Sequence, residues 1–337
     1  MWLVEAETAD AVWQIAASEF REGRRFRKQD GRGGATWEAV PVTFIIRNPR
    51  ERWVVSRMPP INPAFAIAET IWVLNGRSDL SFLDYWNPAY KRFTGTNPHV
   101  HGAYGHRFKV HFGLDQLERA FAAFRSDRDS RQVLLQVWDP RIDLPNADGS
   151  PTSGDTPCAI CSLLKVRDGR LHWTQVMRSN DLFRGVPYDF VLFTTLQEMM
   201  AGWLALEVGS YEHLSDSLHV YERDADAVHG IDPVAPVVNT DRFALPFGES
   251  QQVFTELARR IEMFAAPGLS APELEGLASL CAPDPYRNLL LVMAAESARR
   301  RGWDGINRKL MGQCTNPALA EAWNRWALRL DEKRART

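Results

Sequence analysis

The chain has 337 residues, 45% of them hydrophobic and 11% aromatic, which is enough apolar material for a large buried core and argues against disorder. Its 40 Lys and Arg nearly balance 42 Asp and Glu, so the formal net charge of −2 provides no overall field that would attract nucleic acid or an anionic membrane. Four cysteines are too few for a disulfide framework, and neither a signal peptide nor a membrane-spanning run is recognisable, so we expect a cytoplasmic protein with free thiols.

The N-terminal part of the chain predicts two helices separated by a loop and a strand. An amphipathic helix is expected over residues 5–20, followed at 21–34 by a basic, glycine-rich stretch that predicts a solvated loop able to grip phosphate. A strand is expected over 40–46. Pro63 suits the first turn of a helix, and the apolar residues after it cover almost every face, so this helix is predicted to be buried together with Glu69.

The middle of the chain predicts a binding loop and then a sheet. Residues 87–112 are rich in His, Gly, Asn and aromatic side chains, a composition that favours an irregular binding loop. Strands are expected over 132–138, 159–166 and 171–177. The last two are joined by Arg167-Asp-Gly-Arg, which predicts a tight hairpin because Gly tolerates positive φ.

The C-terminal half predicts a further helix, a strand and a helical extension. A largely apolar helix is expected over 190–206 and a strand over 217–222, and from about residue 250 the pattern becomes helical and charged. We see no internal repeat or linker. The expected architecture is therefore one α+β domain over 1–337, with a mixed sheet packed with helices over about 20–225 and a helical extension over about 250–337.

Cys158 is the first candidate for chemistry. It follows the loop 150–157 at the start of a predicted strand, where a side chain can project from a rigid element into a cleft. A lone Cys in such a place is more often core packing. Cys161 completes a Cys-x-x-Cys, but on a strand the two side chains point to opposite faces, and no second Cys or His pair supplies the remaining zinc ligands. A zinc or dithiol module stays open as an alternative, although we expect no metal.

A second group of polar residues could bind a nucleotide. Arg178 and Ser179 follow a strand and suit a phosphate grip, because a guanidinium fork and a hydroxyl both donate to phosphate oxygens. Asp189 lies just before a long predicted helix, where the ordinary role is a helix N-cap. His219 and Tyr221 share one face of a strand and could reach a sugar hydroxyl, or could equally be semi-buried polar residues.

Taken together, these residues resemble the thymidylate synthase family in order and spacing. The matching motifs are Pro157-Cys158, Arg178-Ser179-x-Asp181-x-Phe183-x-Gly185-x-Pro187 and His219-x-Tyr221, with Glu69-x-x-Trp72-x-x-Asn75-Gly76, Tyr104-Gly105 and Ser130-Arg131-Gln132 outside them. The resemblance covers about residues 20–225. It implies a thymidylate synthase-like α+β fold and a homodimer with shared active sites, with small-molecule nucleotide and folate as ligands.

The resemblance also implies roles for individual residues. The implied catalytic residues are Cys158 as nucleophile, Glu69, Tyr104 and Asp189. The implied nucleotide site comprises Arg32, Arg131 from the other subunit, Gln132, Arg178, Ser179, Asp181, Gly185, Asp189, His219 and Tyr221. The implied site for the carbon donor, 5,10-methylenetetrahydrofolate, comprises Trp72, Asn75, Trp86, Asp181 and Gly185. Nearby guanidinium groups are expected to lower the pKa of Cys158, whereas apolar surroundings are expected to raise that of Glu69.

Asp189 distinguishes this chain within the family. Thymidylate synthases have Asn there, which pairs with uracil, whereas Asp suits the N3 acceptor and N4 amino donor of cytosine and marks the cytidylate hydroxymethylases. The resemblance thus implies a hydroxymethyltransferase acting on CMP or dCMP, and Gln132, where the family has a second arginine, favours CMP. Ala159 in place of the family's His and an unrecognisable C-terminal tail weaken ordinary hydride transfer. A thymidylate synthase acting on dUMP, or a nonenzymatic nucleotide- or zinc-binding protein, remain the alternatives.

Overall fold

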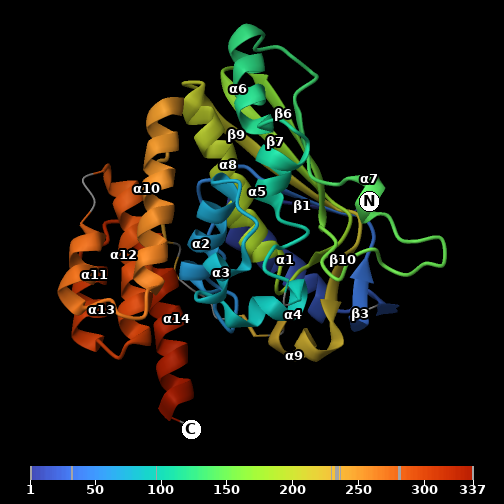
Figure 1. Cartoon of the computed structure of the whole chain (residues 1–337). Helices are drawn as coiled ribbons and strands as arrows, with labels where there is room; N and C mark the ends of the chain where they lie inside the picture. Colours follow the sequence, from blue (N-terminus) through green and yellow to red (C-terminus); the bar gives the residue numbers. More distant parts are fainter. Residues whose placement is uncertain are drawn as a thin grey trace.

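The computed structural model describes residues 2–31, 33–95, 97–228, 230–231, 235, 237–279 and 282–335. Figure 1 shows a large twisted sheet, helices packed on one of its faces and a layer of C-terminal helices beyond them. A smaller sheet lies at one end of the large one. Among the helices of the described residues, none combines the length and the apolar character needed to cross a bilayer.

The large sheet is mixed, as the sequence predicts, and it has six strands. Their order is β1 (Trp2–Ala6), β4 (Val42–Ile46), β9 (Glu207–Ser215), β7 (Arg170–Met177), β6 (Ala159–Arg167) and β5 (Leu134–Gln136), of which β1 and β9 were not predicted. The β1–β4 and β7–β9 pairs are parallel, and the others are antiparallel. The predicted hairpin joins β6 to β7 through Asp168 and Gly169, whose φ angles of 51° and 70° are the positive values that a two-residue hairpin turn requires.

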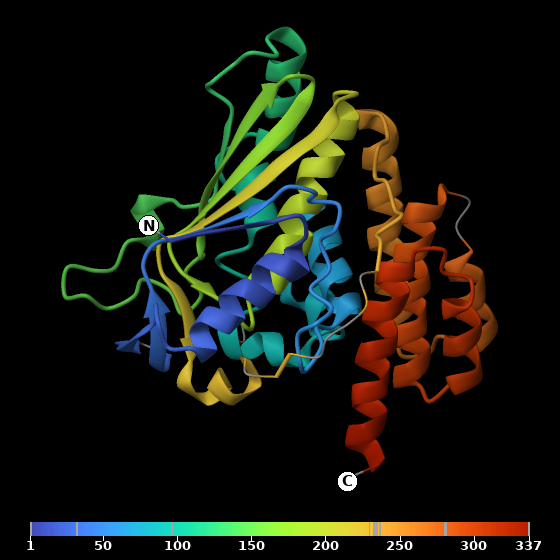
Figure 2. The same cartoon turned by 180° about the vertical axis from the view of Figure 1, so that it is seen from behind.

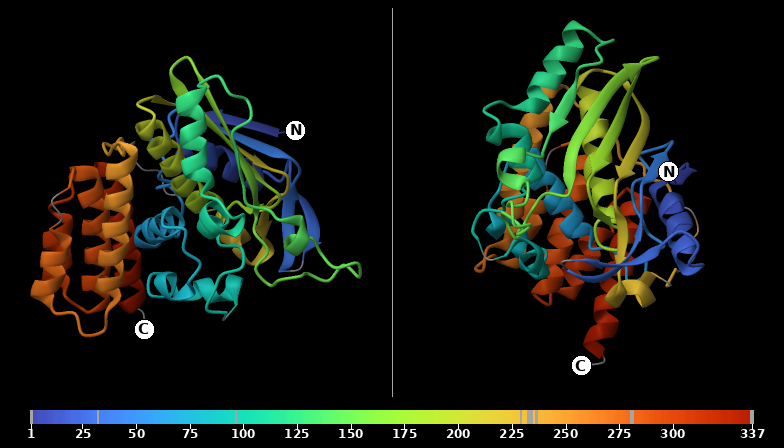
Figure 3. Two further views of the ribbon diagram at one scale, coloured as in Figure 1. Left: turned by 45° about the horizontal axis from the view of Figure 1, so that its top comes forward. Right: turned by 90° about the vertical axis from the view of Figure 1, so that its right-hand side faces the viewer.

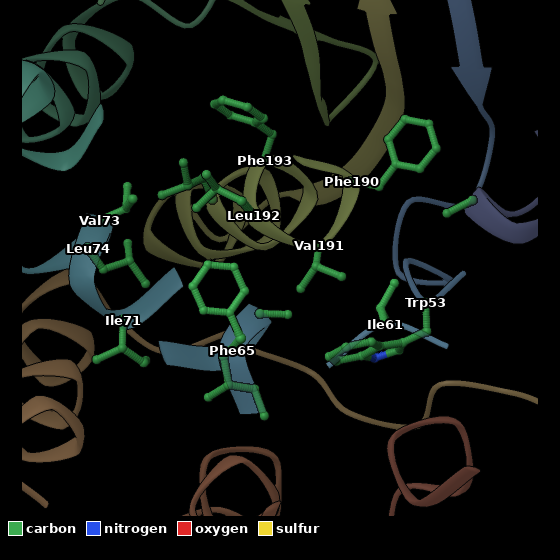
Figure 4. Packing of buried hydrophobic residues seen from close by; sticks show 14 of the residues in the cluster. Trp53, Ile61, Phe65, Ile71, Val73, Leu74, Phe190, Val191, Leu192 and Phe193 are labelled. Carbon is green, nitrogen blue, oxygen red and sulfur yellow. The ribbon is translucent and has the colours of Figure 1, made fainter. Parts of the chain in front are cut away.

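Two apolar helices form the centre of the molecule. α8 (Val186–Trp203) packs on the sheet through β7 and β9, and α2 (Pro63–Leu74) packs on α8. Figure 4 shows Phe65 of α2 beside Val191 and Leu192 of α8. Every residue of α2 is buried except Glu69, which is partly exposed. Such a helix must therefore be covered on all sides but one small opening.

The C-terminal helices supply the remaining cover of α2. This layer consists of α10 (Phe247–Ala265), α11 (Ala271–Ala278), α12 (Asp284–Arg300), α13 (Asp304–Met311) and α14 (Pro317–Ala335). Of these, α10, α12 and α14 contact α2 directly, and Figures 2 and 3 show the layer from other sides. The predicted helical extension is confirmed, and it explains why α2 is apolar all round: sheet-side and extension-side neighbours both bury it.

The N-terminal prediction is partly wrong. The stretch 21–34 is not only a loop, because β2 (Arg27–Gly31) and β3 (Gly34–Ala39) form a hairpin in a second sheet of order β2, β3, β10 (Leu218–Tyr221) and β8 (Asn180–Asp181). All five residues of β2 are exposed, so hydrogen bonds to β3 hold this strand rather than the apolar burial that a sequence pattern reveals.

Other boundaries also differ from the sequence-based prediction. The first helix, α1 (Ala9–Arg21), begins only after Thr8, whose hydroxyl accepts from the backbone N–H of Ala11 at 3.1 Å. The expected helix over 190–206 starts earlier, as α8. The region 87–112 is not irregular throughout, because short helical turns occupy much of it. The remaining short elements are α3 (Leu80–Asp84), η1 (Pro88–Tyr90), α4 (Lys91–Thr94), α5 (Tyr104–His106), η2 (Arg107–His111), α6 (Gln116–Ser126), α7 (Pro140–Asp143), η3 (Glu222–Asp224) and α9 (Ala225–Val228).

Candidate active site

The predicted catalytic residues come from four different parts of the fold. Cys158 immediately precedes β6, Glu69 lies on α2, Tyr104 on α5 and Asp189 on α8. Burial raises the pKa of Tyr104 well above its usual value, and charges on Cys158, Asp189, Tyr90 and Glu69 add to that effect. Side chains from four separate elements are therefore close enough to influence one another's ionisation, as expected for one pocket.

Arg178 holds the segment that carries Cys158. Its Nε donates to the Pro157 carbonyl and its Nη2 to the Thr156 carbonyl, both at 2.9 Å, and its backbone N–H donates to the Cys158 carbonyl at 2.9 Å. Burial raises the pKa of the Cys158 thiol to about 11, and the positive charge of Arg178 only partly opposes it. The expectation of a lowered thiol pKa is thus wrong for the single chain, because desolvation outweighs one guanidinium.

Two carboxyl groups in the pocket favour their neutral forms. Burial raises the pKa of Glu69 to about 8, and the charge of Asp189 contributes, as the apolar surroundings of α2 predict. Burial raises the pKa of Asp189 to about 7, against the lowering effect of a hydrogen bond from Asn180. Both groups can therefore give and take protons near neutral pH.

Asp189 lies inside α8 rather than at its cap. Gly185 is the N-cap residue, and the backbone N–H of Asp189 donates to the Gly185 carbonyl at 3.0 Å. The Asp189 Oδ2 accepts from Asn180 Nδ2 at 2.9 Å. A capping side chain would instead accept from a backbone N–H of the first turn, so the N-cap alternative is wrong.

The sugar and phosphate residues are brought together only in part. Ser179 Oγ lies 3.4 Å from His219 Nδ1, and the rings of His219 and Tyr221 are 5.2 Å apart on one face of β10. A Cβ on Gly33 would lie 2.6 Å from Tyr221 Oη, so the β2–β3 connection reaches this region. The predicted Arg32 lies outside the described residues.

Arg131 and Gln132 stand apart from this group. Both are exposed and precede β5 at the edge of the large sheet. The side chain of Arg131 forms no hydrogen bond or ion pair within the part of the chain that is described, and Gln132 shows only a backbone bond from its N–H to Ser130 Oγ at 3.3 Å. One copy of the chain thus does not bring Arg131 to Arg178.

The predicted folate residues differ in how they are bonded. Asp181 Oδ1 accepts from the backbone N–H groups of Phe183 and Arg184 at 2.8 and 2.9 Å, while its buried Oδ2 has no hydrogen-bond partner among the described residues. That oxygen is available to a ligand donor. Trp72 Nε1 donates to the Asp79 carbonyl at 3.0 Å.

Asn75 and Trp86 complete the predicted folate set. Asn75 Nδ2 donates to the carbonyls of Ile71 and Phe254 at 2.8 and 3.1 Å, which ties α2 to α10. Trp86 is 1% exposed, and its Nε1 lacks a partner within the described ranges. Asn75 is thus occupied by bonds to the protein itself, whereas Trp86 offers a free donor.

Comparison with known proteins is consistent with this geometry. Residues 21–231 match the thymidylate synthase family model. The chain belongs to the thymidylate synthase family. It is 31% identical over 309 residues to a deoxyuridylate hydroxymethyltransferase of Bacillus phage SP01, covering 80% of this chain and 79% of that protein.

Two further relatives show the same family relationship. A deoxyuridylate hydroxymethyltransferase of Pseudomonas phage M6 is 32% identical over 243 residues, which cover 71% of this chain and 66% of that one. A putative thymidylate synthase of Methanothermobacter thermautotrophicus is 34% identical over 220 residues, covering 64% and 91%. The protein is therefore an enzyme that transfers a one-carbon unit to a pyrimidine nucleotide, and the nonenzymatic alternative is wrong. Its family uses methylenetetrahydrofolate as the carbon donor.

Some residues around this thymidylate synthase family site were missed from the sequence. Tyr90 approaches the charges of Glu69 and Cys158, and Asn180 reaches Asp189 from β8. His213 and Tyr211 lie behind Asn180 on β9, a strand that the sequence did not predict. In the sequence, the polar residues that alternate with apolar ones around Tyr211 and His213 could have indicated this strand.

Proposed function

We propose that the protein is a cytosine nucleotide 5-hydroxymethyltransferase. It would convert CMP or dCMP, 5,10-methylenetetrahydrofolate and water to the 5-hydroxymethyl nucleotide and tetrahydrofolate. The observation that carries this proposal is the Asp189 carboxyl, whose pKa burial raises to about 7 and which stands at the position where thymidylate synthases have Asn. As a neutral acid it can donate to N3 of cytosine while its other oxygen accepts from the N4 amino group.

The chemistry assigns a task to each central residue. Cys158 Sγ bonds to C6 of the pyrimidine, which makes C5 a stabilised carbanion able to attack the iminium carbon supplied by the folate. The C5 proton then leaves to a base near Tyr104, and tetrahydrofolate departs, which produces an exocyclic methylene. Glu69 organises the water that adds to this methylene, and the Cys158 sulfur is expelled from C6.

The relatives support the hydroxymethyl outcome but raise a second candidate substrate. Two are named deoxyuridylate hydroxymethyltransferases, which points to hydroxymethylation of a uracil nucleotide. Asp189 favours cytosine instead. Gln132, exposed at the sheet edge, favours CMP over dCMP because it replaces the second arginine of the deoxynucleotide pattern.

Mass spectrometry of CMP, dCMP, UMP and dUMP, each incubated with enzyme and methylenetetrahydrofolate, tests this proposal. We expect a gain of one CH2O unit on a cytosine nucleotide, with CMP, the ribonucleotide, preferred over dCMP. The same gain on dUMP alone would replace the proposal with the reaction that the phage relatives' names describe. A gain of one CH2 unit on dUMP would restore the thymidylate synthase alternative.

We further propose a homodimer in which the partner's Arg131 completes the phosphate site. Among the residues that the structure describes, no helix covers the sheet face opposite α8, as the right-hand view of Figure 3 shows. Leu134 and Leu163, paired across β5 and β6 on that face, are 49% and 36% exposed. A second copy packed there would bury both leucines and present its own Arg131 to the first copy's Arg178.

Mixing two inactive variants should restore activity if the sites are shared. An Arg131→Ala protein and a Cys158→Ser protein should form hybrid dimers with one intact site, giving roughly a quarter of wild-type activity after full subunit exchange. Mixing Arg178→Ala with Cys158→Ser is the matched control, because both residues serve the same subunit's site and no intact site can form. No recovery in the first mixture, with exchange demonstrated, would contradict the shared site.

The kcat/KM for a cytosine nucleotide is expected to fall as pH rises through about 7, because Asp189 then loses the proton that it donates to N3. A second fall in kcat/KM is expected near pH 8, where Glu69 loses its proton. The measurement is kcat/KM against pH. In Asp189→Asn, assayed with a uracil nucleotide, the first fall should vanish and the second should move to lower pH, because one cause of the raised Glu69 pKa is gone. If the dependence of kcat/KM on pH were unchanged in this variant, groups other than Asp189 and Glu69 would cause the two falls.

A further inference from the structure

A buried chain of polar side chains leads away from the pocket behind Asp189. Asn180 Nδ2 lies 2.9 Å from Asp189 Oδ2 and 2.8 Å from His213 Nε2, and His213 Nδ1 lies 2.8 Å from Tyr211 Oη. Tyr211 and His213 are fully buried, and Asn180 is 3% exposed. The His213 ring lies 5.5 Å from that of Phe190 and 6.3 Å from that of Phe44, centroid to centroid. Polar groups in such an apolar layer are costly unless they are bonded to one another.

The bonds in this chain have a defined direction. Burial lowers the pKa of His213 to about 3, so the ring is neutral and carries one N–H. The amide nitrogen of Asn180 only donates, so His213 Nε2 must accept and Nδ1 must carry the proton that is donated to Tyr211 Oη. Both amide hydrogens of Asn180 are thereby used, one on His213 and one on Asp189. The reverse amide orientation would place the Asn180 oxygen against Asp189 Oδ2, a contact that is repulsive whenever Asp189 is ionised.

Gly185 gives the Asn180 amide the space to adopt this orientation. A Cβ at Gly185 would lie 2.6 Å from Asn180 Oδ1. The glycine at the start of α8 therefore lets the amide oxygen rest against the helix backbone, while the amide nitrogen faces Asp189 and His213.

The bond from Asn180 makes the two carboxyl oxygens of Asp189 inequivalent. Because Oδ2 accepts from Asn180, the acid proton is placed on Oδ1, and the carboxyl has one defined donor and one defined acceptor. Cytosine needs a donor at N3 and an acceptor at N4, whereas uracil needs the reverse. Without Asn180 the two oxygens would be equivalent, and the proton could move to satisfy either base.

We propose that Asn180, with His213 and Tyr211 behind it, is a positioning chain that fixes the donor and acceptor oxygens of Asp189 and so sets the choice between cytosine and uracil. This proposal rests on the proposed function, since it assigns the selected base to cytosine. It concerns residues that do not touch the nucleotide themselves, and it therefore predicts a change in selectivity rather than a loss of chemistry.

The test is the ratio of kcat/KM for a cytosine nucleotide to that for the uracil nucleotide of the same sugar. Asn180→Ala should reduce this ratio by at least about tenfold, and Tyr211→Phe, a milder change that keeps the core filled, by about threefold. In an Asp189→Asn background neither change should alter the ratio more than about twofold, because the acid proton whose position Asn180 is proposed to fix is then absent. Ser162→Ala, which removes the buried 2.6 Å bond to Gln175, is the matched control and should leave the ratio unchanged.

The outcomes separate this proposal from the proposed function. A wild-type ratio that favours uracil would overturn the proposed function, whatever the variants do. An unchanged ratio in both Asn180→Ala and Tyr211→Phe, with activity on the two bases lowered equally, would overturn the positioning chain and leave only a structural role. Unfolding temperatures of the variants identify a fold defect in Asn180→Ala, in which case the Tyr211→Phe ratio decides.

Discussion

Cys158→Ser is expected to lower the rate of tritium release from C5 of a labelled nucleotide by at least about a thousandfold. A serine hydroxyl in the same position is a far weaker nucleophile toward C6, and without the C6 bond the C5 hydrogen is not acidic enough to leave. Nucleotide binding, measured by calorimetry, should change little, because Arg178 and Ser179 are untouched. Such a split between binding and exchange is specific to a nucleophile.

Cys314→Ser is the matched control for that experiment. Cys314 is another half-buried thiol with a pKa raised to about 11 by burial, but it lies in the C-terminal layer beside Asn316 rather than near Cys158. This variant should retain full exchange. If Cys158→Ser also retained exchange, the covalent step would have to use another group, and the assignment of the pocket would be wrong.

Asp189→Asn is expected to reverse the base preference, changing the cytosine-to-uracil ratio of kcat/KM by about a hundredfold or more. The amide keeps the size of the carboxyl, and with its oxygen facing N3–H and its NH2 facing O4 it matches uracil, which is the pairing implied for the Asn of thymidylate synthases. In a desolvated pocket a mismatched donor or acceptor remains unpaired, which is why the expected effect is large. Steady-state kinetics on both nucleotides measures it directly.

Asp241→Asn provides the corresponding control. Asp241 is another buried carboxyl whose pKa burial raises, to about 6, but it is bonded to Asn288 and Asn316 in the C-terminal layer at 2.7 Å each. The same chemical change there should leave the base ratio at its wild-type value. If Asp189→Asn left the ratio unchanged as well, Asp189 would be a structural residue of α8 and the cytosine proposal would fall.

The parts of the fold that apolar burial defines were predictable from the sequence. α2 could be identified because its apolar residues cover every face, and the β6–β7 hairpin because Asp-Gly at its tip allows positive φ. β2 could not, since its five residues are all exposed and only backbone bonds to β3 define it. β9 was missed because Ser210, Glu212 and His213 interrupt its apolar pattern.

The site was predictable as a set of residues but not as a geometry. Motif spacing gave Cys158, Arg178 and Asp189, and in the structure the charges of Arg178 and Asp189 both affect the pKa of the Cys158 thiol. The sequence could not show that Asp189 lies inside α8, because that depends on Gly185 starting the helix. Nor could it show the bond from Asn180, which depends on how β8 lies beside α8.

Because α2 is covered on one side by α8 and on the other by the C-terminal helices, the chain cannot be truncated freely. The family-matched region ends at residue 231, yet α10, α12 and α14 beyond it pack on the outer side of α2. A fragment cut at that point would expose a continuous apolar stripe to water and would tend to aggregate. We therefore expect the C-terminal layer and the Glu69 helix to unfold in one cooperative event, as parts of a single catalytic body.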